Sequence, residues 1–275
     1  MATLPVSAAA APPAGVRLED STWTELRDAM RSGTTTVILP VGGTEQNGPH
    51  MALGKHNFRV AAFAERIASQ LGNAVVAPVI AYVPEGRISP PTGHMRYPGT
   101  ISVADDAFRG IVTGAARSFR ENGFRDIVLI GDSGDYQPIL REAAEQLNRE
   151  WAREQGKERG RADARVHYIG SYYDASTAGV AQLLKQRGFA AADIGTHAGL
   201  ADTSLLLAAD ASRVRTQLLR TPQASSAEMG VHGNPAQASA ALGEAGANLV
   251  VERAVTAIRE SIAQAHRPGG EARRP

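Results

Sequence analysis

Hydrophobic residues in this chain fall into two patterns that alternate along it. Short unbroken apolar runs, typical of buried strands, predict strands at 35–41, 74–78, 127–130 and 166–169. Apolar residues at helical spacing predict helices at 22–31, 57–71, 104–122, 137–155, 176–188 and 236–263. Strands that alternate with helices indicate a parallel sheet with helices on both faces.

One folded domain over 19–265 is predicted, because no linker interrupts this alternation. Residues 1–18 are expected to be a flexible leader and residues 266–275 a disordered tail. The Ala- and Pro-rich leader lacks the basic start and the long apolar segment of a signal peptide. It is either the remnant of a removed signal peptide or a floppy terminus. The leader and the absence of cysteine favour an exported chain over a cytoplasmic one, without deciding the compartment.

Composition excludes several classes of function. The formal net charge is +1 and aromatic residues make up 5% of the chain, so we expect no nucleic acid partner. No apolar stretch reaches the roughly 18 residues that a membrane span needs. The chain has no cysteine, which excludes disulfides, thiolate metal sites and cysteine nucleophiles.

The loop after the first predicted strand holds the densest group of chemically active residues. The apolar run 37–39 stops at Pro40 and opens into a Gly-rich loop that contains Glu45, Asn47, His50 and His56. An open α/β sheet builds its sites in loops at the carboxyl ends of its strands. We therefore expect the functional site at this loop.

Two further loops carry ionisable residues and are expected at the same edge of the sheet. Asp132, Ser133 and Asp135 follow the third predicted strand, and His197 and Asp202 precede an apolar helix start. The aspartates could instead be helix N-caps, which satisfy free backbone N–H groups. Together with the first loop, they favour a site for a divalent metal ion.

Three of these residues form a plausible ligand set for one ion. Glu45, His56 and Asp132 would supply two carboxylates and one imidazole. Three protein ligands and one open position are typical of a hydrolytic metal site. Nitrogen and oxygen ligands without sulfur suit Zn²⁺ or Mn²⁺ and do not choose between them.

A long Pro-rich segment, 84–103, has no clear period. Loops of this length are uncommon in compact domains unless they cover a site. His94 and Arg96 of this loop are therefore either substrate contacts or residues of a solvated loop. We expect them to bind substrate.

Three segments resemble the creatininase family. They are Gly-Gly-Thr-Glu-Gln-Asn-Gly-Pro-His at 42–50, His-Met-Arg-Tyr-Pro-Gly-Thr-Ile-Ser at 94–102 and His-Ala-Gly-Leu-Ala-Asp-Thr-Ser at 197–204. The resemblance implies a three-layer α/β/α sandwich with a mostly parallel central sheet, assembled as a homo-oligomer, usually a hexamer. It also implies a two-metal site that hydrolyses C–N bonds of cyclic or linear amides with a metal-bound hydroxide.

The departures from the family pattern fall on the metal ligands. Glu45 stands at a ligating Glu, but His56 stands at the Asp that bridges both metals and Asp132 at a ligating His. Asn47 and Gly134 stand where the second metal has a His and a Glu. One imidazole nitrogen cannot bridge two ions, so we expect one metal ion rather than two.

The resulting hypothesis is a metal-dependent amidohydrolase that cleaves a C–N bond of a small cyclic amide, formamide or related substrate. Asp135 is the predicted general base and His197 the predicted general acid. The alternatives are a lactone or ester hydrolase on the same site and a catalytically silent ligand-binding protein on the same scaffold. Predicted substrate contacts are Asn47, His94, Arg96, Ser133 and Tyr136, and His50 and Asp202 are expected to support the ligands from behind.

Overall fold

The computed structural model describes residues 15–155 and 163–267, which form a sheet between two layers of helices. The sheet has four parallel strands in the order β2-β1-β3-β4. Their bounds are Thr36–Val41 for β1, Ala74–Val76 for β2, Asp126–Gly131 for β3 and Arg165–Tyr168 for β4. The predicted three-layer α/β/α fold with a parallel sheet is confirmed.

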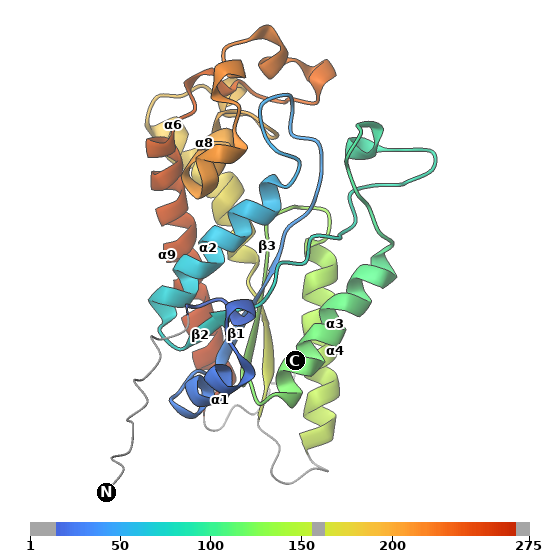
Figure 1. The fold of residues 1–275 in the computed structure, drawn as a ribbon, viewed down its shortest axis with the longest axis vertical. Helices are drawn as coiled ribbons and strands as arrows, with labels where there is room; N and C mark the ends of the chain where they lie inside the picture. Colours follow the sequence, from blue (N-terminus) through green and yellow to red (C-terminus); the bar gives the residue numbers. More distant parts are fainter. Residues whose placement is uncertain (1–14, 156–162, 268–275) are drawn as a thin grey trace, which may run out of the picture.

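Helices cover both faces of this sheet (Figure 1). Helices α2, α8 and α9 lie on one side, and α3 and α4 lie on the other. The bounds are Trp23–Arg31 for α1, Lys55–Leu71 for α2, Asp105–Glu121 for α3, Gln137–Gln155 for α4, Gly170–Asp174 for α5, Val180–Gln186 for α6, Ala191–Ile194 for α7, Leu200–Asp210 for α8 and Ala240–Ala265 for α9.

Alternate residues of each central strand enter different cores. Ile38 and Val128 pack in the core that contains α2 and α9, whereas Val37 and Ile127 pack in the core that contains α3 and α4. Successive side chains of a strand point to opposite faces, so a strand covered on both faces is apolar at every position. The unbroken apolar runs in the sequence therefore correspond to the buried centre of the sheet.

The predicted helix at 176–188 starts earlier than its apolar pattern suggested. The chain turns into α5 at Gly170, passes through a π-helical turn over Ala175–Gly179, and continues as α6. Tyr172 of α5 is fully buried. Its packing against the sheet favours helical structure at the low-propensity Gly170, because tertiary contacts override local propensity.

Two terminal stretches predicted outside the domain take part in the fold. The backbone oxygen of Val16 accepts a hydrogen bond from the backbone nitrogen of Val76, on the edge strand β2. His266 Nε2 lies 2.8 Å from Asp126 Oδ1. The rest of the predicted leader and tail, 1–14 and 268–275, and the predicted loop over 156–162 lie outside the described residues. Among the described helices, none is long and apolar enough to cross a membrane.

Candidate active site

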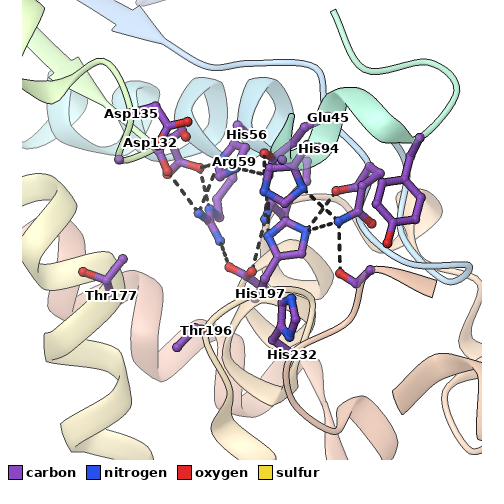
Figure 2. Close-up of a pocket in the computed structure, with 18 of the residues that line it drawn as sticks. Glu45, His56, Arg59, His94, Asp132, Asp135, Thr177, Thr196, His197 and His232 are labelled. Carbon is purple, nitrogen blue, oxygen red and sulfur yellow. Dashed lines mark hydrogen bonds and ion pairs between the residues drawn. The ribbon is translucent and has the colours of Figure 1, made fainter. Parts of the chain in front are cut away.

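The site lies where the order of the strands reverses. From the two adjacent central strands, β1 leads to β2 on one side and β3 leads to β4 on the other. The loops that follow β1 and β3 therefore open at a topological switch point, which is the usual ligand position in an open α/β sheet. A pocket of about 610 Å³ opens there, and Figure 2 shows the residues that line it.

His56 connects two buried carboxylates. Its Nε2 lies 2.8 Å from Glu45 Oε1, and its Nδ1 lies 2.7 Å from Asp132 Oδ2. The three residues proposed as ligands are thus in contact, but the carboxylates lie against opposite nitrogens of one ring. A metal ion binds the lone pair of a single ring nitrogen. This arrangement therefore does not direct Glu45, His56 and Asp132 at one shared ion, which corrects the ligand set expected from the sequence.

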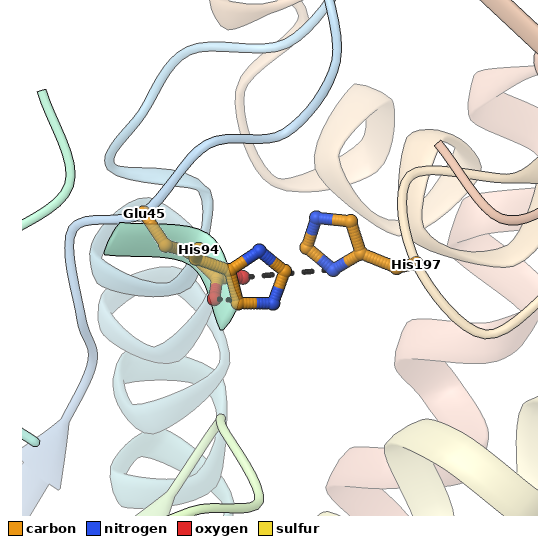
Figure 3. A group of neighbouring side chains, drawn as sticks. All are labelled: Glu45, His94 and His197. Atoms are coloured by element: carbon orange, nitrogen blue, oxygen red, sulfur yellow. Dashed lines mark ion pairs between the residues drawn. The ribbon is translucent and has the colours of Figure 1, made fainter. Parts of the chain in front are cut away.

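A second group of possible ligands surrounds Glu45 on the pocket side. Figure 3 shows Glu45, His94 and His197 facing one another. One ligand atom from each lies within 4.8 Å of the others, and this is the metal-like group found among the described residues. His94 Nε2 lies 3.4 Å from Glu45 Oε2, and His197 Nδ1 lies 3.7 Å from Glu45 Oε1.

The hydrogen bonds of Gln46 orient both rings. The backbone oxygen of Gln46 lies 2.9 Å from His197 Nε2 and accepts its proton, which leaves the Nδ1 lone pair directed at Glu45. The side-chain nitrogen of Gln46 lies 2.9 Å from His94 Nδ1. Ligation through His94 Nε2 needs a proton on Nδ1 and therefore requires the Gln46 amide to turn.

The donor chemistry of this group fits one Zn²⁺ or Mn²⁺ ion. A carboxylate and two imidazoles are the ligands of several catalytic zinc sites, with the remaining position open to water or substrate. The group lies on the wall of the pocket and not beneath it, because Glu45, His94 and His197 all line the cavity. The structure thus moves the candidate metal position from Asp132 toward His94 and His197.

Two buried cations, which the sequence interpretation missed, neutralise the other half of the site. Lys55 Nζ lies 3.1 Å from Asp202 Oδ2 and 3.4 Å from Glu45 Oε1. Arg59 Nε lies 2.7 Å from Asp132 Oδ2, and Arg59 Nη1 lies 2.8 Å from Asp202 Oδ1. Burial raises the pKa of Asp202, but Lys55 and Arg59 outweigh it and hold that pKa well below its usual value.

A sequence signal for these cations existed in α2. Val60, Phe63 and Ile67 form the buried stripe of this helix, and steps of four residues from Phe63 toward the N-terminus reach Arg59 and then Lys55. A charged residue on the buried stripe of a helix must meet a partner, because an unpaired buried charge is strongly unfavourable.

Glu85, in the Pro-rich loop, is a second residue that the sequence interpretation missed. Its side chain is buried close to that of Glu45. Burial and the negative charge of Glu45 raise the pKa of Glu85 to about 9, so Glu85 is protonated at neutral pH. Burial also opposes the ionisation of Glu45, but His56 and Lys55 hold the pKa of Glu45 well below its usual value. The pair therefore carries one proton, on Glu85.

His197 does not suit the predicted role of general acid. Burial and the nearby Lys55 lower its pKa to about 3, so the ring is neutral at pH 7 and has no extra proton to donate. Asp135, the predicted general base, is exposed and lines the pocket. Its role remains a prediction.

Two of the five predicted substrate contacts lie away from the pocket. Asn47 is fully buried, and its side-chain nitrogen donates to the backbone oxygens of Glu45 and Ala52. Tyr136 is fully buried, and its hydroxyl bonds to the backbone of Val41 and Gly42. Both residues shape loops, and this corrects the roles expected for them.

Four of the other predicted residues line the pocket, and their roles stay predictions. His94, Arg96 and Ser133 line the pocket, together with Asp202. His50 is buried, and its Nε2 lies 3.1 Å from both the backbone oxygen of Ala198 and the hydroxyl of Thr203. His50 therefore ties the loop after β1 to the start of α8.

Comparison with known families decides what kind of protein carries this site. The family model for creatininase (creatinine amidohydrolase) matches residues 19–258. The chain belongs to the creatininase family. Its named relatives are hydrolases, and the chain is an enzyme of that kind.

Curated creatininase-family relatives include enzymes named for different substrates. Creatinine amidohydrolase of Pseudomonas putida is 30% identical over 68% of this chain and 69% of that relative. A mycofactocin precursor peptide peptidase of Mycolicibacterium smegmatis is 27% identical over 78% and 81% of the two chains. A 3-dehydro-scyllo-inosose hydrolase of Thermotoga maritima is 31% identical, but the match spans 44% of this chain and only 37% of that relative.

Solved creatininase structures have the same fold. A mutant creatininase aligns with a TM-score of 0.74 and 27% identity over 90% of this chain and 98% of that one. A creatininase described as the Mn form aligns with a TM-score of 0.69 and 26% identity over 92% and 100% of the two chains. Another mutant creatininase is described as Zn-Zn type, so the family includes both metals.

Proposed function

We propose that this creatininase-family chain is a metal-dependent amidohydrolase that cleaves a C–N bond of a small cyclic amide, formamide or related substrate. One divalent ion, Zn²⁺ or Mn²⁺, is assigned to Glu45, His94 and His197. The observation that carries the proposal is a single one: a buried, ionised Glu45 faces two imidazoles on the wall of the pocket. A divalent ion held there supplies a bound water of lowered pKa and polarises a carbonyl group.

The size of the pocket supports a small substrate. Its volume of about 610 Å³ lies within the range of roughly 300–1,000 Å³ typical of small-molecule sites. Relatives named for creatinine, an inosose and a peptide show that the family scaffold accepts different substrates. We therefore propose that the bond cleaved is a C–N bond and that the substrate is a small polar amide.

The side chains around the pocket take separate roles in this proposal. Asp135, an exposed carboxylate on the pocket wall, takes a proton from the attacking water and returns it to the leaving nitrogen. Arg96 and Ser133 orient the substrate from two different loops. Glu85 keeps its proton, so that only Glu45 of this pair is charged.

We also propose that the chain assembles as a homo-oligomer, with a hexamer as the expectation. An apolar groove between the segment 77–82 and helix α3 supports this proposal. Tyr82 and Ile111 on its walls are 57% and 45% exposed, which is unusual for large apolar side chains outside an interface. Light scattering coupled to size-exclusion chromatography measures the assembly directly.

The test of the function combines metal content and turnover. Purified chain is dialysed against Zn²⁺ or Mn²⁺, analysed for metal per chain, and screened against lactams, formamides and lactones. Glu45→Gln should lose the ion and all detectable turnover, because it removes the only charged ligand. The control Glu142→Gln changes an exposed carboxylate of α4 and should keep both.

Three outcomes would each contradict the proposal in a different way. Turnover that persists in metal-free chain would exclude a metal-dependent reaction. Cleavage of lactones without any cleavage of amides would assign the site to an ester hydrolase. A chain that binds no ion and turns over nothing in the screen would match a ligand-binding relative.

A further inference from the structure

We propose that Lys55 and Arg59 act as built-in cations in place of a second metal ion, so that the chain binds no more than one divalent ion. The inference rests on the proposed function for the identity of the first ion only. It concerns the half of the site around Asp132 and Asp202.

Both carboxylates in this half already have their partners. Asp132 Oδ2 contacts His56 Nδ1 and Arg59 Nε, each at 2.7 Å, and Asp132 Oδ1 accepts a hydrogen bond of 3.0 Å from the Tyr172 hydroxyl. Asp202 Oδ1 accepts from Arg59, and Asp202 Oδ2 accepts from Lys55. Each of the four carboxylate oxygens therefore already has a partner, and three of the four have a charged or imidazole partner that an incoming ion would have to displace or share.

Displacement would be costly because the two cations cannot easily leave. The side chains of Lys55 and Arg59 are 1% and 2% exposed, and both residues belong to the first turns of α2. A guanidinium does not lose its proton in proteins and presents several donors in a fixed plane. Removal of one partner from a buried ion pair leaves the other charge uncompensated, which is strongly unfavourable.

The charge balance also allows one ion better than two. The carboxylates of Glu45, Asp132 and Asp202 meet two side-chain cations, Lys55 and Arg59, and the His56 ring lies between Glu45 and Asp132, so the cluster sums to −1 or above. One divalent ion takes the cluster to at least +1, whereas a second would take it to at least +3. Like charges gathered in one partly buried site repel one another more strongly than they would in water.

The two positions that could have supplied further ligands offer none to the pocket. The amide nitrogen of Asn47 is bound by backbone oxygens of its own loop, and Asn47 does not line the pocket. Gly134 lines the pocket but has no side chain that could bind an ion.

The experiment counts ions in variants of the two cations. Wild-type chain, Arg59→Gln and Lys55→Met are dialysed against Mn²⁺ and, separately, Zn²⁺, and metal per folded chain is measured by elemental analysis. Wild type should hold one ion, and Arg59→Gln should hold one more, because Asp132, Asp202 and His56 lose their fixed cation. Arg59→Lys keeps the charge and should hold one, and Arg66→Gln, an exposed position on the same helix, is the matched control.

A thermal melt of the same proteins gives a readout that does not depend on activity. Mn²⁺ should raise the melting temperature of Arg59→Gln by more than it raises that of wild type. If Arg59→Gln folds only when Mn²⁺ is present, that result supports the proposal as well.

The outcomes separate this inference from the proposed function. Two ions in wild type would overturn the inference and leave the metal-dependent hydrolase standing. No ion in wild type but one in Arg59→Gln would overturn the proposed function and leave the inference standing. Folded Arg59→Gln and Lys55→Met that gain no ion over wild type would overturn the inference.

Discussion

The two halves of the site stabilise their buried carboxylates in different ways. Around Glu45 two imidazoles, His94 and His197, face the pocket and one cation, Lys55, lies 3.4 Å away, whereas Asp132 and Asp202 are held at closer range by buried side-chain cations. The first half therefore keeps a lone pair and a carboxylate available to a ligand. The second half is already neutralised by the chain itself. Ionisable residues at a sheet edge thus form a candidate ligand site where imidazoles face the pocket beside them, and not where internal cations occupy both oxygens of a carboxylate.

The largest expected effect is a loss of stability when Arg59, the cation between Asp132 and Asp202, is replaced. Arg59→Ala leaves the Asp132 and Asp202 carboxylates without their cation, and loss of one partner from a buried pair typically costs about 3–5 kcal/mol. Chemical denaturation without added metal should show a loss of that size. The control Arg66→Ala breaks an exposed pair and should cost about 0–1 kcal/mol. A loss of under about 1 kcal/mol at Arg59 would show that the pairing is not needed there.

A smaller effect is expected in the half that faces the pocket. Gln46→Ala removes the amide that contacts both His94 and His197, while the backbone oxygen that accepts from His197 stays. Loss of such supporting hydrogen bonds weakens metal binding by about 10–100-fold. Isothermal titration with Zn²⁺ measures the change. Unaltered affinity would mean that the amide does not position the ring.

The third expected effect is a dependence of stability on pH that is spread over several pH units. The pKa of Glu85 is raised to about 9 in the fold from an ordinary value near 4.5, so the folded chain holds a proton that the unfolded chain has lost between these values. The contribution of Glu85 to stability is therefore complete below about pH 4.5 and is lost as the pH rises through about 9.

Glu85→Gln should remove this dependence. The free energy of unfolding of wild type should fall with pH between about 5 and 9, by at most about 1.4 kcal/mol per pH unit from this group. The variant should show a shallower slope over the same range in urea denaturation at several pH values. Identical slopes in both proteins would mean that Glu85 ionises normally in the fold.

The sheet and the position of the site could be predicted from the sequence for clear physical reasons. Strands covered on both faces leave unbroken apolar runs, and the Gly-rich loop with Glu45 directly follows one of them. The contacts within the site could not be predicted in the same way. Which nitrogen of His56 meets which carboxylate, and whether Arg59 reaches Asp202 across 143 residues, depends on packing and not on spacing.

Two residues show where the prediction failed. Tyr136 directly follows Asp135 in the sequence and was expected to contact substrate, but its side chain is buried in the core that contains α3 and α4. Glu85 lies in a Pro-rich segment without periodicity, so no pattern indicated its burial against Glu45. In both cases the side-chain direction, which a loop sequence does not specify, decided the role.

Anomalous diffraction from a crystal of the wild-type chain loaded with Mn²⁺ tests the central claim most directly. The account predicts one manganese peak per chain, bounded by Glu45, His94 and His197, with the Arg59 guanidinium still between Asp132 and Asp202. A peak at Asp132, with Arg59 turned away from it, would contradict the account.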